Sequence, residues 1–306
     1  MDDSKNHISV NICTYRRNHL LERLLRKLAL QETGGYFDFS VVVVDNDAAG
    51  PAREIVRTLQ RELSLELIYD IEPVQTIPAA RNHAFLLSKG NYIGIIDDDE
   101  LPLLDWLVTL YRAIQAFDAF GALGPVYPFF ETAPPTWLVK SGLCERPVHR
   151  TGTLLDWHQT RTGNVLLKKE VFDEHNLCFD LNHKTSGSDQ QFFKEAIQYG
   201  YRFIAVAEAP VYEVVTPERQ TRSYYLKRFT LQGANARKFS APHLKGIAKL
   251  LTPIKVLAAL IYSLLIIPFC FVLGNHAVLK YAAKASYHLS WLLAMSGLDL
   301  GRKRNL

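Results

Sequence analysis

Several common signatures are missing from this chain, and each absence excludes a class of protein. No GxGxxG motif follows the first expected strand and no GxxxxGK[ST] motif occurs, so dinucleotide-binding and P-loop interpretations lose their main support. The 4 cysteines show no CxxC spacing and indicate buried free thiols of a reducing compartment. The first residues contain no apolar run, so we expect no cleaved signal peptide.

The net positive charge comes from one segment. The formal net charge of the 306 residues is +4, and residues 241–306 carry a large excess of Lys and Arg over one acid, Asp299. The positive charge is therefore a property of the tail, and we expect no nucleic-acid partner.

The order of the expected elements predicts the fold class. Apolar runs rich in β-branched residues alternate with segments of helical periodicity, joined by short connections. Expected strands cover residues 7–14, 39–47, 65–69, 91–96, 121–127 and 202–207. Expected helices cover residues 18–30, 51–63, 78–88 and 103–117, and a further one ends near 199. Such alternation predicts an α/β fold with a doubly wound, mostly parallel sheet.

The stretch from 91 to 100 organises the rest of the chain. It begins as a buried-strand pattern and ends in four consecutive acids, Asp97, Asp98, Asp99 and Glu100. Adjacent carboxylates repel, so they are best tolerated around a divalent cation or at a helix N-terminus. Hard cations such as Mg²⁺ and Mn²⁺ take carboxylate oxygens and are often shared with substrate phosphates. An acidic first turn of the next helix is the alternative.

Four segments together carry a family resemblance. They are residues 13–17 (CTYRR), 42–47 (VVVDND), 80–82 (ARN) and 96–102 (IDDDELP). In this order and spacing they resemble the nucleotide-sugar half of an inverting family-two glycosyltransferase with the GT-A fold. The likeness is greatest to bacterial exopolysaccharide enzymes of the succinoglycan glucosyltransferase type. It covers roughly residues 7–240.

The resemblance implies roles on the donor side. Thr14, Tyr15 and Arg16 would line the base and ribose. Asp45 would accept hydrogen bonds from the nucleobase, since a carboxylate only accepts and uracil and guanine present N–H donors. Arg81 would bind the diphosphate or base through its fork of donors. The alternatives are a turn cap for Asp45 and a surface ion pair for Arg81.

The acids would form the metal site. Asp97 and Asp98 would face the ribose and the metal's waters, with Asp97 also a candidate ligand, and Asp99 would coordinate Mg²⁺ or Mn²⁺ directly. Val214 stands where relatives often have a histidine that completes the site, and it cannot ligate. His183 is a nearby substitute candidate.

A second acidic segment is expected to supply the catalytic base. Residues 186–193 match the family's Gly-Glu-Asp-x-Asp-Phe-Phe pattern, with Asp189 at the position of the base. An inverting transfer needs one carboxylate to take the proton of the attacking hydroxyl. Ser188 and Gln191 depart from the pattern, which puts acceptor recognition in doubt more than catalysis. An N-cap of the next helix is the alternative for Asp189.

Four further residues are expected on the acceptor side or at a diphosphate. Trp137 lies in a loop-rich region and could stack on a sugar, and Asn164 belongs to a Thr-Gly-Asn segment beside the family's acceptor site. Arg219 and Arg222 are candidates to grip a diphosphate. Core packing, a turn and a solvated helix face are the respective alternatives.

The tail is expected to associate with a membrane. The run from 256 to 273 has no charge and is slightly shorter than the ~20 residues of a relaxed span. A second helical segment, 277–298, carries Lys280, Lys284 and His288 on one face. We therefore expect residues 1–240 to form the catalytic domain, with a nucleotide-sugar half (1–127) and an acceptor half (128–240). Residues 241–306 would form a helical hairpin on the cytoplasmic face of a bacterial inner membrane. A buried hairpin of a soluble protein is the alternative.

The sequence thus predicts a metal-dependent inverting glycosyltransferase. Its partners would be a nucleotide-diphospho-sugar, with a UDP-sugar favoured, a saccharide acceptor linked to a polyprenyl diphosphate, and membrane lipid. A nucleotidyltransferase on a related sheet and a catalytically silent partner protein are the alternatives.

Overall fold

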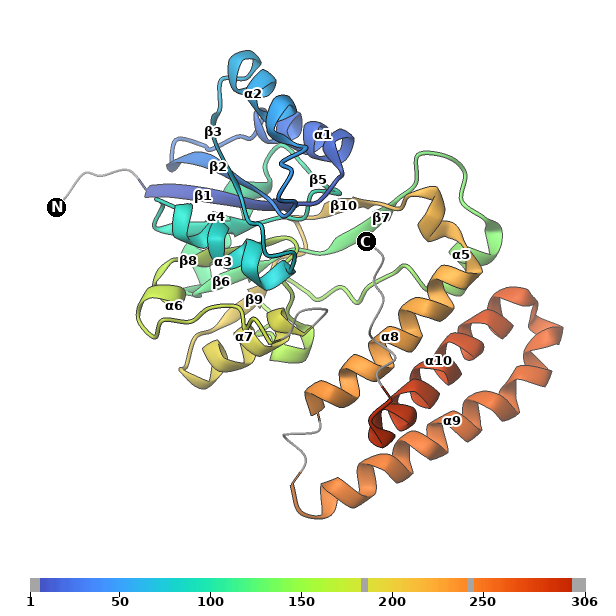
Figure 1. Ribbon diagram of the computed structural model, residues 1–306. Helices are drawn as coiled ribbons and strands as arrows, with labels where there is room; N and C mark the ends of the chain where they lie inside the picture. The colour runs from blue at the N-terminus through green and yellow to red at the C-terminus, as the bar shows by residue number, and fades with distance from the viewer. Residues whose placement is uncertain (1–5, 183–186, 241–244, 299–306) are drawn as a thin grey trace. The chain divides into compact units, whose positions relative to one another are not determined.

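The computed structural model describes residues 6–182, 187–240 and 245–298, and the chain divides into two compact units (Figure 1). The first unit comprises residues 1–129 and 146–214, and the second comprises residues 130–145 and 215–306. The units are divided differently from the expected boundary at residue 240, because segments 130–145 and 215–240 group with the tail.

A seven-stranded sheet in the order β3-β2-β1-β4-β8-β6-β9 forms the centre of the first unit. Four neighbouring strands run parallel: β1 (Asn6–Thr14), β2 (Phe37–Asp45), β3 (Glu66–Ile71) and β4 (Tyr92–Ile95). Strand β8 (Val165–Lys168) is antiparallel to β4 and to β6 (Gly121–Leu123), and β9 (Phe203–Ala205) is parallel to β6. The expected mostly parallel sheet is confirmed.

Helices cover both faces of this sheet. One face packs against α1 (Asn18–Leu28), α2 (Arg53–Glu62) and α4 (Trp106–Phe117). The other packs against α3 (Ile77–Leu87), α6 (Glu170–Asp173) and α7 (Ser188–Gln198). The four valines of β2 alternate between the two cores, and all are buried. This burial on both faces explains the continuous apolar run in the sequence. The short helix η1 (Trp157–Gln159) packs against α7.

The single strand expected over 121–127 is wrong. Two strands occupy this segment: β6 belongs to the large sheet, and β7 (Val126–Phe129) belongs to a three-stranded sheet with β10 (Val211–Val214) and β5 (Glu100–Pro102). Gly124 and Pro125 separate them, and Asn164 fixes the break. Its backbone oxygen accepts the Gly124 N–H over 3.1 Å, and its side-chain Nδ2 donates to the Pro125 oxygen over 2.8 Å.

The second unit is helical. It contains α5 (Thr136–Ser141), η2 (Pro217–Gln220), α8 (Arg222–Ser240), α9 (Ile247–Leu273), α10 (Asn275–Leu293) and η4 (Ala294–Ser296). Helix α10 contacts both α8 and α9 along its length. Gly233 of α8 lies so close to α10 that a Cβ there would stand 2.0 Å from the Tyr287 oxygen. The expected pair of tail helices joined near Gly274 is confirmed.

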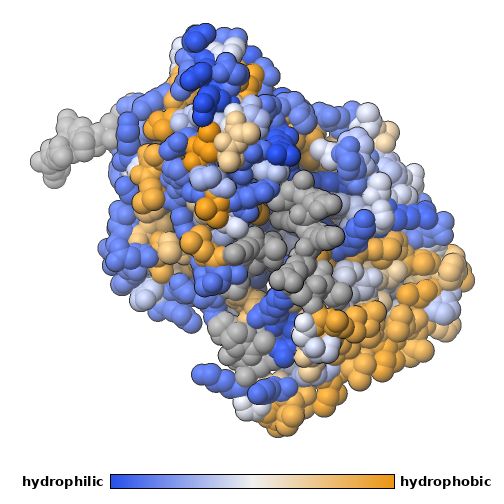
Figure 2. All heavy atoms as spheres, viewed as in Figure 1, coloured by the Kyte–Doolittle hydropathy of each residue, from blue (hydrophilic) through white to orange (hydrophobic). Residues whose placement is uncertain are grey.

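Helix α9 is apolar and exposed. Among the described residues it is the one helix long and apolar enough to cross a membrane, and only 17% of its most apolar window is buried. Figure 2 shows a broad apolar surface over these C-terminal helices. The outward apolar side chains include Leu257, Ile261, Leu264, Leu265 and Phe269.

The cysteines are free, as expected, but burial was predicted for all of them and only Cys270 is buried. Cys178 is exposed, and Cys13 and Cys144 are intermediate.

Candidate active site

Three parallel strands end at one edge of the large sheet. Strand β1 ends at Thr14 and β2 at Asp45, and these two residues are register partners. Strand β4 ends at Ile95, directly before the acidic residues 97–100. Since open α/β sheets bind ligands outside the carboxyl ends of their strands, this edge is the candidate site.

Residues 97–100 form a closed acidic turn. The Glu100 N–H donates to the Asp97 backbone oxygen over 3.0 Å, and the Asp97 N–H donates to Oε2 of Glu100 over 3.1 Å. The backbone oxygen of Asp99 accepts the N–H of Val214 in β10 over 2.8 Å. The turn is therefore fixed between β4 on one side and the three-stranded sheet on the other.

Asp98 and Asp99 are almost fully buried, at 3% and 4% exposed. The Thr14 hydroxyl donates to Oδ2 of Asp98 over 2.8 Å, and Nη1 of Arg17 lies 2.9 Å from Asp98 Oδ1 and 3.2 Å from Asp99 Oδ2. Burial raises the pKa of Asp98, and the positive charge of Arg17 opposes this. The sequence interpretation gave Arg17 no role, although its place directly after β1 was a usable signal.

Asp45 faces inward. The side chain is 0% exposed and accepts the N–H groups of Asp47 and Ala52, over 3.2 and 2.9 Å. The hydroxyl of Tyr69 also donates to it, over 3.1 Å. Burial and the Asp45 charge raise the pKa of Tyr69 to about 12. These contacts are those of the turn-capping alternative, and nucleobase contact by Asp45 stays a prediction.

Tyr15 and Arg16 lie beyond the end of β1. Arg16 has a positive φ of 54°, and its guanidinium carbon stands 5.1 Å from the Tyr15 ring centre. Its Nε lies 2.6 Å from Oδ2 of Asp47, in the segment after β2. The ends of β1 and β2 are thereby joined by an exposed ion pair.

Arg81 of α3 points to the acidic turn. Its Nη2 is 3.7 Å from Oδ1 of Asp97, and its side chain is only 13% exposed, so it is not the surface ion pair of the alternative interpretation. The guanidinium also stands 5.5 Å from the Phe179 ring centre. The next residue, Asn82, exchanges two hydrogen bonds with the Phe179 backbone. Helix α3 thus holds Arg81 beside Asp97.

A second set of charged side chains lies at the acidic turn. Glu100 is 1% exposed, and its register partner across β5 and β10 is Glu213, which is bonded to Arg146. Burial and the charges of Asp97, Asp99 and Glu213 raise the pKa of Glu100 well above its usual value. Burial, together with the Arg146 charge, lowers the pKa of Arg161.

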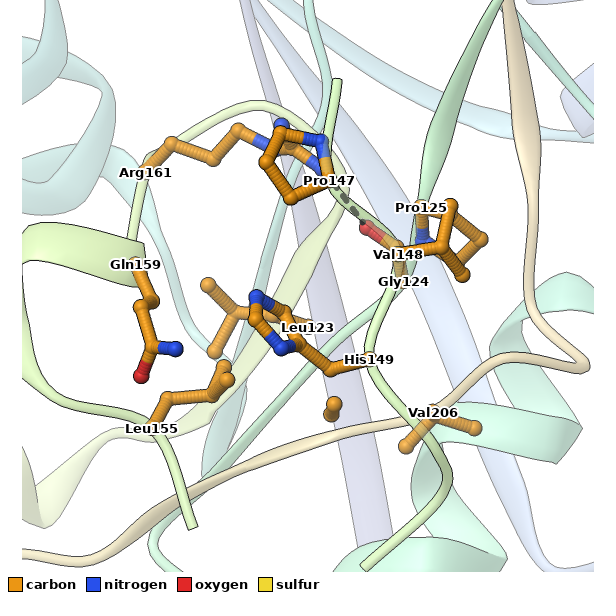
Figure 3. A pocket seen from close by; sticks show the side chains of 11 residues that line it. Leu123, Gly124, Pro125, Pro147, Val148, His149, Leu155, Gln159, Arg161 and Val206 are labelled. Atoms are coloured by element: carbon orange, nitrogen blue, oxygen red, sulfur yellow. Dashed lines mark hydrogen bonds between the residues drawn. The ribbon is translucent and has the colours of Figure 1, made fainter. Parts of the chain in front are cut away.

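Arg161 also lines a small hollow, shown in Figure 3 with Gln159 and His149 beside it. Its Nη2 donates to the Gly124 oxygen over 3.4 Å. The hollow has a volume of about 30 Å³, which matches one water molecule rather than a sugar.

Asn164 and Asp189 have different surroundings. Asn164 is 0% exposed with φ 55°, and its amide bonds to Trp106, Pro125 and Ala209 over 2.7, 2.8 and 2.8 Å. The structure therefore supports the alternative in which Asn164 satisfies a turn, and its expected acceptor contact is not seen.

Asp189 is half-buried at the second position of α7. The helix N-cap is Gly187, so the N-cap alternative for Asp189 is wrong.

The second unit brings two predicted residues together. The Arg222 guanidinium carbon stands 5.8 Å from the Trp137 ring centre, and Tyr225 packs edge-on against Trp137 at 6.1 Å. Arg219 lies in η2, ahead of α8. Trp137 and Arg222 thus form one aromatic and cationic cluster, although the sequence placed them at different ligands.

The acidic turn fits a hard cation held partly by phosphate. Among the described residues no group of three or more His, Cys, Asp or Glu side chains could hold a metal ion. The donor set is nevertheless carboxylate oxygen, and the Asp97 side chain is 49% exposed beside Asp99. Mg²⁺ is commonly bound by one or two carboxylates plus substrate phosphates. Val214 cannot ligate, and His183 lies outside the described residues.

The family model for glycosyl transferase family 2 matches residues 9–178, which include the three strand ends and the acidic turn. The chain belongs to glycosyl transferase family 2. It is 31% identical over 245 residues to the succinoglycan biosynthesis protein ExoM of Rhizobium meliloti, covering 79% of this chain and 77% of ExoM. This family 2 chain is therefore a glycosyltransferase.

Solved structures share its GT-A fold. The mannosyltransferase PcManGT from Pyrobaculum calidifontis, in complex with GDP-Man and Mn²⁺, has a TM-score of 0.60 at 18% identity, covering 95% of this chain and 88% of that one. TarS 1–349 of S. aureus in complex with UDP-GlcNAc has a TM-score of 0.55 at 15% identity, covering 95% and 92%.

Proposed function

We propose that this glycosyltransferase moves a sugar from a nucleotide-diphospho-sugar, preferably a UDP-sugar, to a saccharide acceptor with inversion at the anomeric carbon. The observation that carries the proposal is the acidic turn at the carboxyl end of β4, beside the ends of β1 and β2. The similarity to a succinoglycan biosynthesis protein supports a role in bacterial surface polysaccharide synthesis.

The donor would lie along this edge. Thr14, Tyr15 and Arg16 would line the base and ribose, and Asp45 would shape the base site from below. Arg81 would bind the diphosphate with its fork of N–H donors, because it already stands beside Asp97. Solved structures of the same fold in complex with UDP-GlcNAc and GDP-Man support a donor of this class.

Asp99 and Asp97 would hold a divalent cation, Mg²⁺ or Mn²⁺, with Asp98 ordered by Thr14 and Arg17 behind them. The bound cation supplies a Lewis acid that neutralises the departing nucleoside diphosphate. Arg81 would add positive charge on the same side.

Asp189 would take the proton of the acceptor hydroxyl as the base. Its side chain is half-buried at the start of α7, and its Oδ1 accepts the Gln190 N–H over 2.9 Å. This leaves carboxylate capacity for a hydroxyl.

The second unit would serve a lipid-linked acceptor. Trp137 offers an aromatic face to a sugar, and Arg222 and Arg219 offer charge to a polyprenyl diphosphate. The exposed apolar surface of α9 would hold the enzyme on the cytoplasmic face of the inner membrane. An acceptor that stays in the membrane would then need no diffusion through water.

A donor screen tests the function. The full chain in detergent would be given UDP- and GDP-sugars with Mg²⁺ or Mn²⁺, and nucleoside diphosphate release would be measured. We expect release that EDTA abolishes and excess Mn²⁺ restores, and no release from Asp99→Ala, which should also bind UDP more weakly in Mn²⁺. Full activity in EDTA would refute the metal role. Diphosphate release from a nucleoside triphosphate instead would show a nucleotidyltransferase.

A further inference from the structure

Glu100 has an unusual environment for an acid next to a donor site. Its carboxyl is buried, and Oε1 has no hydrogen-bond partner within the part of the chain that the structure describes. Burying a polar oxygen without a partner is costly. The presence of Glu100 in this buried position is therefore not explained by its own contribution to stability.

The neighbours of Glu100 explain its buried position. Its Oε2 closes the acidic turn by accepting the Asp97 N–H. Its Oε1 packs on Gly163, where a Cβ would stand 2.7 Å from Glu100 Oε1 and 3.1 Å from Asp97 Oδ2. Gly163 precedes Asn164 and β8, so the acidic turn and the segment leading into β8 touch without a gap.

The glycine is required by space and not by backbone conformation. Gly163 is absent from the described glycines with positive φ. An alanine there would be strained only because both acid side chains occupy the space that its methyl group needs. On the opposite side, Asn164 anchors the same segment through Trp106, Pro125 and Ala209.

We propose that Glu100 is a positioning residue that interlocks the acidic turn with Gly163, so that Asp97 and Asp99 are held in register with β8. The inference rests on the proposed function for its effect on the donor. A misplacement of ~1 Å far from the reacting atoms costs roughly 10²-fold in rate, so such an interlock matters for catalysis.

Four variants of the full chain test the interlock: Glu100→Gln, Glu100→Ala, Gly163→Ala and the double variant Glu100→Ala/Gly163→Ala. The matched control is Gly94→Ala in β4, where a Cβ meets ordinary contacts of 3.5 Å or more. Each protein would be measured for Mn²⁺-dependent UDP binding by calorimetry, for kcat and KM of the donor, and for urea unfolding.

The expected pattern separates positioning from mere stability. Glu100→Ala should weaken Mn²⁺-dependent UDP binding by about tenfold or more, and Glu100→Gln, which keeps the shape, should stay within about threefold. Gly94→Ala should match wild type. A merely structural role would instead lower the unfolding midpoint and leave the Mn²⁺ dependence of UDP binding unchanged.

The double variant tests the contact between Glu100 and Gly163 without the need for any ligand. Removing the Glu100 side chain should relieve part of the strain that Gly163→Ala introduces, so the two effects on unfolding should not add. Additive effects, or wild-type UDP binding by Glu100→Ala, would overturn the inference. If wild type itself bound no nucleotide, the proposed function would fail, and the unfolding cycle would still decide the interlock.

Discussion

Burial differs sharply between the residues of the candidate site. Asp45 and Asn164 are 0% exposed, and their polar atoms bond to the protein. Asp97 is about half exposed, and Asp189 is half-buried. Of these carboxylates, Asp97 and Asp189 are therefore the most accessible, whereas Asp99 is only 4% exposed.

Substituting Asp189 by asparagine tests the base. Asp189→Asn keeps the shape and removes the proton affinity, so turnover should fall by roughly 10²-fold or more while UDP binding survives. Near-normal turnover of Asp189→Asn would move the role elsewhere, with Asp156 and Asp180 the next candidates.

The reactivity of Cys13 reports the electrostatics of the donor edge. Burial raises its pKa to about 12, the Arg81 charge opposes this, and the charges of Asp97 and Asp98 add to it. The thiol therefore stays protonated at pH 8, because the thiolate forms only as the pH approaches this raised pKa. Iodoacetamide should modify the exposed Cys178 well before Cys13, as read by mass spectrometry. Equal rates in the folded protein would contradict this, and equal rates are expected only after unfolding.

The sequence predicted where the candidate site lies but not how its side chains are oriented. Residue types at the strand ends predicted the acidic turn and Asp45, since parallel strands end at one edge. The partners that turn Asp45 and Asn164 inward, Tyr69 and Trp106, lie far away in the chain. Contacts between residues so far apart in the chain leave no signal in the local sequence pattern. The roles assigned to the site residues stay predictions.

At the scale of elements, the strand break at Gly124 and Pro125 marks the limit of periodicity. The residues on both sides have strand character, and only the bond from Asn164 to Pro125 shows that they enter different sheets. Most elements from β1 to α4 were predicted because each carries its own apolar period and a short connection, but the three-residue strand β5 is too short to show one. Helix α5 is too short for a period to show within the loop-rich region.

At the crossing of α8 and α10, we expect a glycine-to-alanine substitution to change stability in the direction opposite to the usual one. Replacing glycine by alanine inside a helix usually stabilises by about 0.5–1 kcal/mol. At Gly233 the new Cβ would stand 2.0 Å from the Tyr287 oxygen and 2.3 Å from Ser290 Oγ. Gly233→Ala should therefore destabilise by about 1–3 kcal/mol.

Urea unfolding in detergent measures this effect, and hydrogen exchange over α8 and α10 locates it. Gln232→Ala, at the exposed neighbouring position, is the control and should change little. A stabilised Gly233→Ala would show that the helices do not cross this closely.

At the scale of the whole molecule, the chain joins an α/β unit that carries the donor edge to a helical unit that carries the apolar surface. The sequence predicted both units but placed the boundary between them at residue 240. Helix α8 is polar enough to resemble the catalytic part, yet it packs against α10 through Gly233. A boundary set by tertiary packing has no mark in composition.

The last prediction concerns membrane attachment by α9. Its 27 residues span about 40 Å as a helix, enough for a hydrocarbon core of ~30 Å. The rings of Tyr262 and Tyr281 lie 6.3 Å apart, so α10 returns antiparallel along α9. Lys280 and Lys284 are exposed on α10 and would be costly at mid-bilayer, at about 2.5–3.5 kcal/mol each. We therefore expect α9 and α10 to enter one leaflet of the membrane with these lysines at the headgroups. We do not expect them to span the bilayer.

Fractionation of cells tests this attachment. The full chain should stay with membranes in high salt and be released by detergent, because apolar burial is not screened by ions. Replacing Leu257, Ile261 and Leu265 by serine should move it to the soluble fraction. The same number of serines at Leu30, Leu86 and Leu154, exposed leucines of the first unit, should leave it on the membrane. Recovery of wild type from the soluble fraction without detergent would show that α9 is covered by protein in the cell.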